Sequence, residues 1–303
     1  MNESKKLKIG LLLGGLSSER EVSLKTGEAI YNALITLGYS VDKIDPKLDD
    51  LYNKSKDVDV IFNALHGRFG EDGLIQGFLE TIQKPYTGSP VVSSSIAMNK
   101  VFTKQILSFY QIPIINFKEI SSLKDLESIK FDFPMVVKPA NEGSSVGITL
   151  VKNKKALLKD VKNGLSKYGE LLVEPYIKGQ EVQVAVLNGE VLGTVEIQPE
   201  NEFYDYDAKY VSHGTKYLTP ANISNNVSNK LFEYSKKING ILKCNGVIRI
   251  DYIVKGNEMF LLEVNTLPGM TNSSLIPKIA KHNGISFEQL VEKIVESAKI
   301  HGI

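Results

Sequence analysis

The sequence predicts an α/β protein that begins with an open parallel sheet and continues into antiparallel sheets. Two observations predict this class. A buried strand, a helix and a second buried strand alternate over residues 8–67, which is the order typical of an open α/β sheet. Segments 133–151 and 170–197 are rich in β-branched residues and broken by glycine, a pattern that indicates antiparallel strands. The length of 303 residues is enough for two or three domains.

The first element predicted is a buried parallel strand in "KIGLLLGG", residues 8–15. A helix follows it and stops at Gly38, because glycine is a frequent C-terminal stop. Apolar residues recur along this helix at i, i+3, i+4 and i+7, the spacing of one helix face: Ile30, Ala33, Leu34 and Leu37.

A second buried strand is predicted in "DVDVIFNALHG", residues 57–67, and it runs into a polar loop. Ligands of open α/β sheets bind beyond the carboxyl ends of the strands. The segments that follow the two strands, 14–20 and 66–72, are therefore the candidate ligand-binding loops.

Two further helices complete the pattern. The turn-rich segment 86–95, "YTGSPVVSSS", predicts a domain boundary, and a helix is expected over 96–110. The last helix, in "SFEQLVEKIVESA", begins with a capping box formed by Ser286 and Gln289, and we expect its apolar stripe to lie in the core.

Composition and charge exclude several classes of protein. Lys and Arg number 36 and Asp and Glu number 35, so no charge excess marks a nucleic-acid or membrane partner. No apolar run reaches the length of about 18 residues that a membrane-spanning helix needs. The single cysteine, Cys244, excludes an intramolecular disulfide and fits a reducing compartment. We therefore expect a cytoplasmic location.

A glycine-rich hairpin is predicted in "KPANEGSSVG", residues 138–147. Glycine lets backbone N–H groups approach a phosphate closely, and Lys138 can hold phosphate oxygens as a point charge. The segment is not a P-loop, because no Gly-Lys-Ser/Thr ends it and the β-branched "ITLV" that follows favours a strand. An ordinary hairpin without a ligand fits this segment equally well.

Charged residues near the C-terminal strands form a candidate metal site. Side chains two positions apart on a strand share a face, so Glu263 lies beside Asn265 and Arg249 beside Asp251. The short connection 255–258 would bring Asp251 opposite Glu263. Carboxylate and amide oxygens suit Mg²⁺, and two ions about 3.5–4 Å apart can share a bridging carboxylate. A structural Arg–Asp pair and a strand end that faces water are the alternatives.

Taken together, these motifs resemble the D-alanine–D-alanine ligase family of the ATP-grasp superfamily over essentially the whole chain. The motifs occur in this order: "GGLSSEREVS" (14–23), "ALHGRFGEDGLIQG" (64–77), "YTGS" with "AMNK" (86–100), "KPANEGSSVG", "YDYDAKY" (204–210), "RIDY" and "EVNTLPGMTNSSL" (263–275). The resemblance implies a three-domain ATP-grasp architecture with limits 1–90, 91–177 and 178–303. Two antiparallel sheets, one in the central and one in the C-terminal domain, would grip ATP.

The resemblance implies ATP and two Mg²⁺ ions, with Mn²⁺ as an alternative metal. The metal ligands it implies are Asp251, Glu263 and Asn265. The implied ATP contacts are Lys100, Lys138, Ser145, Glu174, Glu181 and Lys209. Within this set, Glu174 would begin the adenine-binding hinge, Glu181 would take the ribose hydroxyls, and Lys209 would contact the γ-phosphate.

The resemblance also implies two D-alanine molecules as substrates. The implied catalytic residues are Glu19, Ser144, Tyr210, Arg249 and Gly269, and the implied substrate-binding residues are His66, Ser274 and Leu275. Glu19 would pair with the ammonium of the first D-alanine, while Arg249 and the Gly269 N–H would hold an oxyanion. Tyr210 would link Glu19 to Ser144 and close the 204–215 loop as a lid. Ser274 and Leu275 would bind the carboxylate of the second D-alanine.

The reaction that the resemblance implies is the ATP-dependent ligation of two D-alanines through an acyl phosphate. The product would serve as a peptidoglycan precursor, and the enzyme would be a homodimer.

Three alternatives are open. Another ATP-grasp ligase would differ at Glu19, Tyr210 and the 274–275 segment. A D-alanine–D-lactate ligase is disfavoured. The resemblance implies Phe at this position in the ligases that join D-lactate, whereas this chain has Tyr210. A two-lobed binding module without turnover has no need for the cluster of Asp251 and Glu263.

Overall fold

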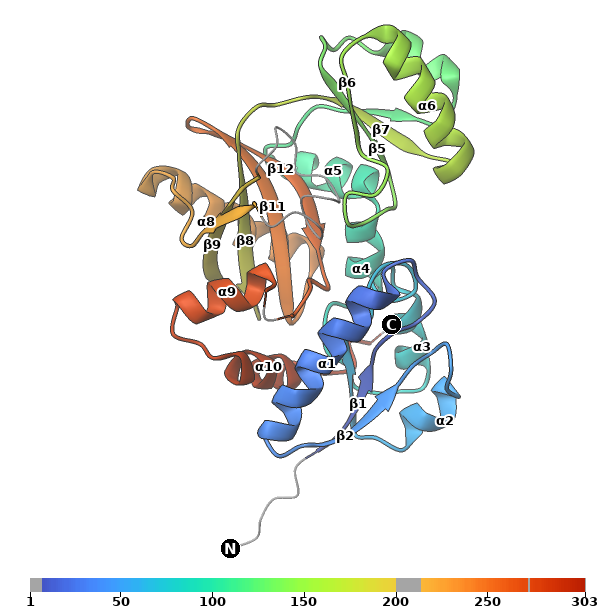
Figure 1. The fold of residues 1–303 in the computed structure, drawn as a ribbon, viewed down its shortest axis with the longest axis vertical. Helices are drawn as coiled ribbons and strands as arrows, with labels where there is room; N and C mark the ends of the chain where they lie inside the picture. Colours follow the sequence, from blue (N-terminus) through green and yellow to red (C-terminus); the bar gives the residue numbers. More distant parts are fainter. Residues whose placement is uncertain (1–6, 200–213, 272, 303) are drawn as a thin grey trace, which may run out of the picture.

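The computed structural model describes residues 7–199, 214–271 and 273–302, which form three sheets with helices around them. In Figure 1 a three-stranded sheet lies in the lower lobe, a four-stranded sheet at the upper right and a five-stranded sheet at the left. The α/β class is confirmed. None of the helices in the described ranges is both long enough and apolar enough to cross a membrane.

The lower lobe is a parallel sheet of order β2-β1-β3 with three helices. Its elements are β1 (Lys8–Leu12), α1 (Arg20–Thr36), β2 (Ser40–Ile44), α2 (Leu51–Lys56), β3 (Val60–Asn63) and α3 (Leu74–Thr81). The predicted alternation of strand, helix and strand is confirmed. Gly38 adopts a φ of +81°, which suits glycine in the turn after α1.

The four-stranded sheet is antiparallel, with the order β4-β7-β5-β6. Its elements are β4 (Lys118–Ile120), the 3₁₀ helix η1 (Leu123–Ser128), β5 (Met135–Pro139), β6 (Thr149–Val151), α6 (Lys154–Tyr168) and β7 (Leu171–Pro175). Val137 pairs with Thr149, so the glycine-rich segment connects two antiparallel strands as predicted.

The five-stranded sheet is antiparallel, with the order β10-β9-β8-β11-β12. Its elements are β8 (Gln180–Leu187), β9 (Glu190–Gln198), β10 (Lys216–Leu218), α8 (Asn225–Leu242), β11 (Val247–Lys255), β12 (Glu258–Asn265), α9 (Leu275–His282) and α10 (Phe287–Glu296). The predicted hairpin register is confirmed, since Asp251 pairs with Glu263 and Arg249 with Asn265.

The prediction of one helix over 96–110 was wrong, because the chain forms two shorter helices there. These are α4 (Val91–Met98) and α5 (Lys100–Phe109). Asn99 separates them with extended backbone angles of φ −92° and ψ 108°, and its side chain accepts the N–H of Phe102 at 2.9 Å. Asn99 thus caps α5 and places Lys100 at its first position. The predicted domain limits at 90 and 177 stay a prediction.

One hydrophobic core joins the two ends of the chain. Helix α10 starts with the predicted capping box of Ser286 and Gln289, and it packs beside α1 (Figure 1). The contributing side chains include Ile30, Ala33 and Leu34 of α1 with Leu290, Val291 and Ile294 of α10. This core also includes side chains of β8 and β9, so it fixes the N-terminal loops against the five-stranded sheet.

Gly27 allows α1 to approach the end of the first strand. A Cβ at Gly27 would lie 2.6 Å from Leu13 Cβ, an atom that cannot move without the backbone. We expect Gly27→Ala to lower the free energy of unfolding by about 1–3 kcal/mol, the usual cost of overpacking. The midpoint of urea denaturation followed by circular dichroism measures this change.

Gly77→Ala in α3 is the matched control, because a Cβ at Gly77 meets nothing within 4 Å. Alanine is better than glycine inside a helix by about 0.5–1 kcal/mol, so this variant should be as stable as the wild type or more stable. A Gly27→Ala protein that is no less stable than wild type would contradict the close packing.

Candidate active site

Two adjoining pockets lie among the three sheets, and together they contain most of the predicted site residues. The intersheet pocket lies between the two antiparallel sheets, and its lining includes Lys100, Lys138, Ser145, Glu174, Glu181, Asp251 and Glu263. The loop pocket lies between the N-terminal loops and the five-stranded sheet, and its lining includes Glu19, His66, Ser144, Arg249, Glu263, Asn265, Gly269, Ser274 and Leu275. Glu263 lines both pockets, so the two spaces share a wall.

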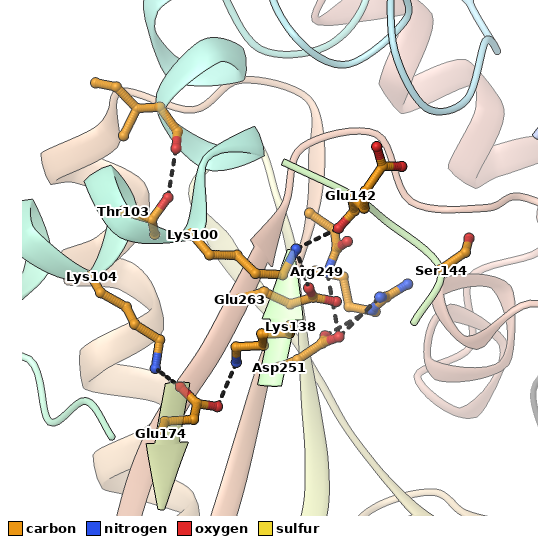
Figure 2. A network of polar contacts seen from close by, with 12 residues as sticks. Lys100, Thr103, Lys104, Lys138, Glu142, Ser144, Glu174, Arg249, Asp251 and Glu263 are labelled. Atoms are coloured by element: carbon orange, nitrogen blue, oxygen red, sulfur yellow. Dashed lines mark hydrogen bonds and ion pairs between the residues drawn. The ribbon is translucent and has the colours of Figure 1, made fainter. Parts of the chain in front are cut away.

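Lys100 joins the glycine-rich segment to this shared wall. Its Nζ donates to the carbonyl oxygen of Glu142 at 2.5 Å and lies 3.4 Å from Glu263 Oε2 (Figure 2). The side chain is buried at the first position of α5. Its charge therefore faces a space lined by Asp251 and Glu263 rather than bulk water.

Glu174 sits between two buried lysines on the wall of the intersheet pocket. Its Oε1 accepts from Lys138 Nζ at 2.5 Å, and its Oε2 accepts from Lys104 Nζ at 2.8 Å (Figure 2). Burial alone would raise the pKa of Glu174, but the two lysines outweigh it and hold the pKa below its ordinary value. The carboxylate is therefore ionised at neutral pH.

Sequence reasoning missed Lys104. The signal was available, because Lys104 follows Lys100 by one helical turn and lies on the same stripe as Val101 and Leu107 of α5, both of which are buried. A lysine in the middle of an apolar stripe needs a buried anion as its partner.

The candidate metal site is formed at the C-terminal end of β12. Asp251 is 2% exposed and forms a bidentate ion pair with Arg249, at 2.8 Å from Nε and 2.9 Å from Nη2 (Figure 2). Asn265 Nδ2 donates to Asp251 Oδ2 at 3.3 Å. The structural Arg–Asp pair considered as an alternative therefore exists, and it lies inside the predicted metal cluster.

The donor set at this site suits a hard divalent cation. Asp251 and Glu263 offer carboxylate oxygens from directly paired positions, and Asn265 offers an amide oxygen on the same face as Glu263. Within the described ranges, no group of three or more His, Cys, Asp or Glu side chains forms a metal site. This candidate set consists of two carboxylates and an amide, and Asp251 would share its charge between Arg249 and the ion.

A network of hydrogen bonds fixes the loop that carries Glu19. Arg20 pairs with Asp45 at 2.6 Å and donates to the Gly15 carbonyl at 2.9 Å, which anchors the loop to the end of β2. The Ser17 hydroxyl donates to the His66 carbonyl at 2.5 Å, so the two predicted ligand-binding loops are tied together. Glu19 then begins α1 as its N-cap and lines the loop pocket.

His66 is buried and held from two sides. Its Nε2 lies 3.2 Å from Thr26 Oγ1, and its Nδ1 lies 3.8 Å from Glu71 Oε1. Glu71 also accepts the N–H of Gly67 at 2.5 Å and lines the loop pocket. Glu71 is a second residue that sequence reasoning did not select, although it lies in the candidate loop 66–72.

Ser144 connects the glycine-rich segment to the N-terminal lobe. Its hydroxyl hydrogen-bonds to Glu19 Oε1, and both residues line the loop pocket. Ser144 and Ser145 have φ values of +51° and +58°, which non-glycine residues seldom adopt. Contacts such as the one to Glu19 are needed to hold two such residues in succession.

The N-terminus of α9 faces the loop pocket. Ser274 is the N-cap of this helix, and its Oγ accepts the N–H of Thr271 at 3.0 Å. A Cβ at Gly269 would lie 3.2 Å from Ser274 Oγ, so the turn is closely packed. The first N–H groups of a helix have no partner within the helix and attract anions. This end of the loop pocket therefore suits a carboxylate.

Two predicted site residues, Lys209 and Tyr210, lie outside the described residues, as does most of the predicted 204–215 lid. The other predicted site residues all line one or both pockets.

Comparison with known proteins gives a consistent result. The protein-family models for the N-terminus and the C-terminus of D-ala D-ala ligase match residues 42–89 and 106–296 of this chain, respectively. The D-alanine–D-alanine ligase of Geotalea uraniireducens is 44% identical over 99% of this chain and 98% of its own length. That of Carboxydothermus hydrogenoformans is 45% identical over 95% and 97%.

Solved structures agree with the sequence matches. A crystal structure of the Bacillus anthracis D-alanine–D-alanine ligase complexed with ATP has a TM-score of 0.85 and 32% identity, over 96% of this chain and 97% of that chain. A second crystal structure of that ligase has a TM-score of 0.86 and 36% identity over the same shares.

Proposed function

This chain belongs to the D-alanine–D-alanine ligase family, and we propose that it joins two D-alanine molecules at the loop pocket with ATP bound in the intersheet pocket. It is an ATP-dependent ligase of ATP-grasp fold. The observation that carries the proposal is the position of Glu263 in the lining of both pockets. A phosphate in one pocket and a carboxylate in the other can therefore meet at one wall.

The intersheet pocket has the chemistry that a nucleotide requires. Its apolar lining suits a flat heterocycle and includes Ile115, Val136, Ile148, Ile253 and Leu262. Lys100 and Lys138 bind the phosphates as point charges, and Glu181 accepts from the ribose hydroxyls. Glu174 begins the segment 174–177, which lines the pocket and forms the hinge beside the adenine. Ser145 and Lys209 complete the phosphate contacts.

The first D-alanine binds with its ammonium at Glu19, near His66, and with its carboxylate at the shared wall. A carboxylate is a poor electrophile, so transfer of the γ-phosphoryl group to one of its oxygens activates it as an acyl phosphate and releases ADP. The lysines stabilise the charge that spreads over the transferring oxygens. Ser144 and Tyr210 hold the glycine-rich segment closed over this reaction and exclude water.

The second D-alanine binds with its carboxylate at Ser274 and Leu275, where the N-terminus of α9 favours an anion. Its amine attacks the acyl carbon, and inorganic phosphate leaves as the peptide bond forms. Arg249 and the Gly269 N–H stabilise the tetrahedral oxyanion. One donor of this kind is typically worth about 10²–10³ in rate.

Asp251, Glu263 and Asn265 are the residues that would hold Mg²⁺, with Mn²⁺ as a substitute and two ions as the full complement. A bound ion would supply positive charge to the phosphate oxygens. A homodimer in the cytoplasm, without a nucleic-acid or membrane partner, completes the proposal. It is supported by the family resemblance and by the near balance of acidic and basic residues.

Phosphate release tests the function directly. We expect the full-length chain with Mg²⁺ and ATP to release phosphate only when D-alanine is added, with D-alanyl-D-alanine as the product by mass spectrometry. ATP binding without turnover would favour the binding module instead. Turnover with a different carboxylate and amine, but not with D-alanine, would favour another ATP-grasp ligase.

Glu263→Gln should lower kcat by about 10- to 100-fold or more, because a metal site loses one charge at an unchanged volume. The Mg²⁺ concentration for half-maximal rate should rise at the same time, and a magnesium titration of phosphate release measures both. Glu258→Gln is the control on the same strand, since Glu258 is exposed at the hairpin turn. Normal turnover of Glu263→Gln at ordinary Mg²⁺ would remove Glu263 from the site.

Tyr210→Phe should shift the product toward the ester D-alanyl-D-lactate when D-alanine and D-lactate compete. The phenol would no longer link Glu19 and Ser144, and this weakens the selection for an amine nucleophile. The ratio of the two products by mass spectrometry is the measurement, with Tyr52→Phe on the exposed side of α2 as a control. An unchanged ratio would argue against this role of Tyr210.

A further inference from the structure

Lys104 is a fully buried lysine that the proposed reaction does not use. Its side chain lies inside the protein with its Nζ 2.8 Å from Glu174 Oε2 and 3.4 Å from the carbonyl oxygen of Ile115. The ammonium also lies 5.7 Å from the ring centroid of Phe117. Burying a charge is costly in free energy unless a partner compensates for it, so a lysine at this position calls for an explanation.

Lys104 reaches the intersheet pocket through one shared carboxylate. Glu174 accepts from Lys104 on one oxygen and from Lys138 on the other, and both Lys138 and Glu174 line the pocket (Figure 2). Two cations and one anion leave a net positive charge on this wall. Without Lys104 the remaining pair of Lys138 and Glu174 would be neutral, and one carboxylate oxygen would lose its ion-pair partner.

We propose that Lys104 is a positioning residue that, through Glu174, keeps the charge of Lys138 available to the phosphates of the nucleotide. It does so in two ways. It neutralises the carboxylate that would otherwise hold Lys138 as an isolated neutral pair, and it fixes that carboxylate from the side of α5. The inference rests on the proposed function, since it takes ATP as the occupant of the intersheet pocket.

The protonation state of the cluster agrees with this role. Burial lowers the pKa of Lys104 to about 8, and the adjacent Glu174 limits the fall. The ammonium therefore keeps its proton at pH 7. Helix α5 presents Lys100 and Lys104 one turn apart, so a single helix supplies one cation directly to the pocket and a second through Glu174.

The affinities of Lys104→Met for ATP and for adenosine test the proposal. Adenosine lacks the phosphates that Lys138 binds, so we expect the ATP dissociation constant to rise about 10-fold and that of adenosine to change less than about twofold. Isothermal titration of the full-length chain with Mg²⁺ measures both. The KM for ATP should rise while the KM for D-alanine stays unchanged.

Two further variants separate charge from packing. Lys155→Met removes an exposed lysine of α6, the helix that packs against the four-stranded sheet. This variant should bind both ligands as the wild type does. Lys104→Arg keeps a cation beside Glu174 while it changes the shape of the side chain. This conservative variant should bind ATP and adenosine in the wild-type ratio, and it also decides the matter if Lys104→Met alone does not fold.

The outcomes distinguish this proposal from the proposed function. Equal losses of ATP and adenosine affinity in Lys104→Met would mean a structural role only, and unchanged affinities would mean no role. A Lys104→Arg variant that loses as much ATP affinity relative to adenosine as Lys104→Met does would also overturn the proposal. A wild-type chain that binds no ATP would overturn the proposed function itself.

Discussion

The antiparallel pairing of β11 with β12 is the constraint on which the site depends. Because Asp251 faces Glu263 and Arg249 faces Asn265, one register puts the candidate metal ligands and Arg249, the cation proposed to bind the oxyanion, on the same few positions. A slip of one residue would turn these side chains to the opposite face of the sheet. The hairpin is embedded in a hydrophobic core with β8 and α8, and that burial holds the register.

Electrostatic balance is the second condition for the site. The buried carboxylates of the site are paired with cations: Glu174 pairs with two lysines, and Asp251 pairs with Arg249. Lys100 lies between a backbone carbonyl and Glu263. In such an environment charges act on a ligand more strongly than in water, and they need no rearrangement when charge develops during the reaction.

The loop pocket draws its parts from segments far apart in the chain. Glu19 comes from the N-cap of α1, Ser144 from the connection between β5 and β6, and Ser274 from the N-cap of α9. Two contacts bring them together: the hydrogen bond between Ser144 and Glu19, and the shared core of α1 and α10. The glycine-rich segment therefore closes onto a lobe that the C-terminal helix holds in place.

Three features could be predicted from the sequence alone: the α/β class, the glycine-rich hairpin and the opposition of Asp251 to Glu263. They could be predicted because alternation along a strand and a short connection are local properties. It did not determine the break at Asn99, where a side-chain cap replaces one helix by two. It also did not reveal the role of Lys104. That lysine meets Glu174 across 70 residues of chain, and only the packing of α5 against the four-stranded sheet brings the two charges together in the interior.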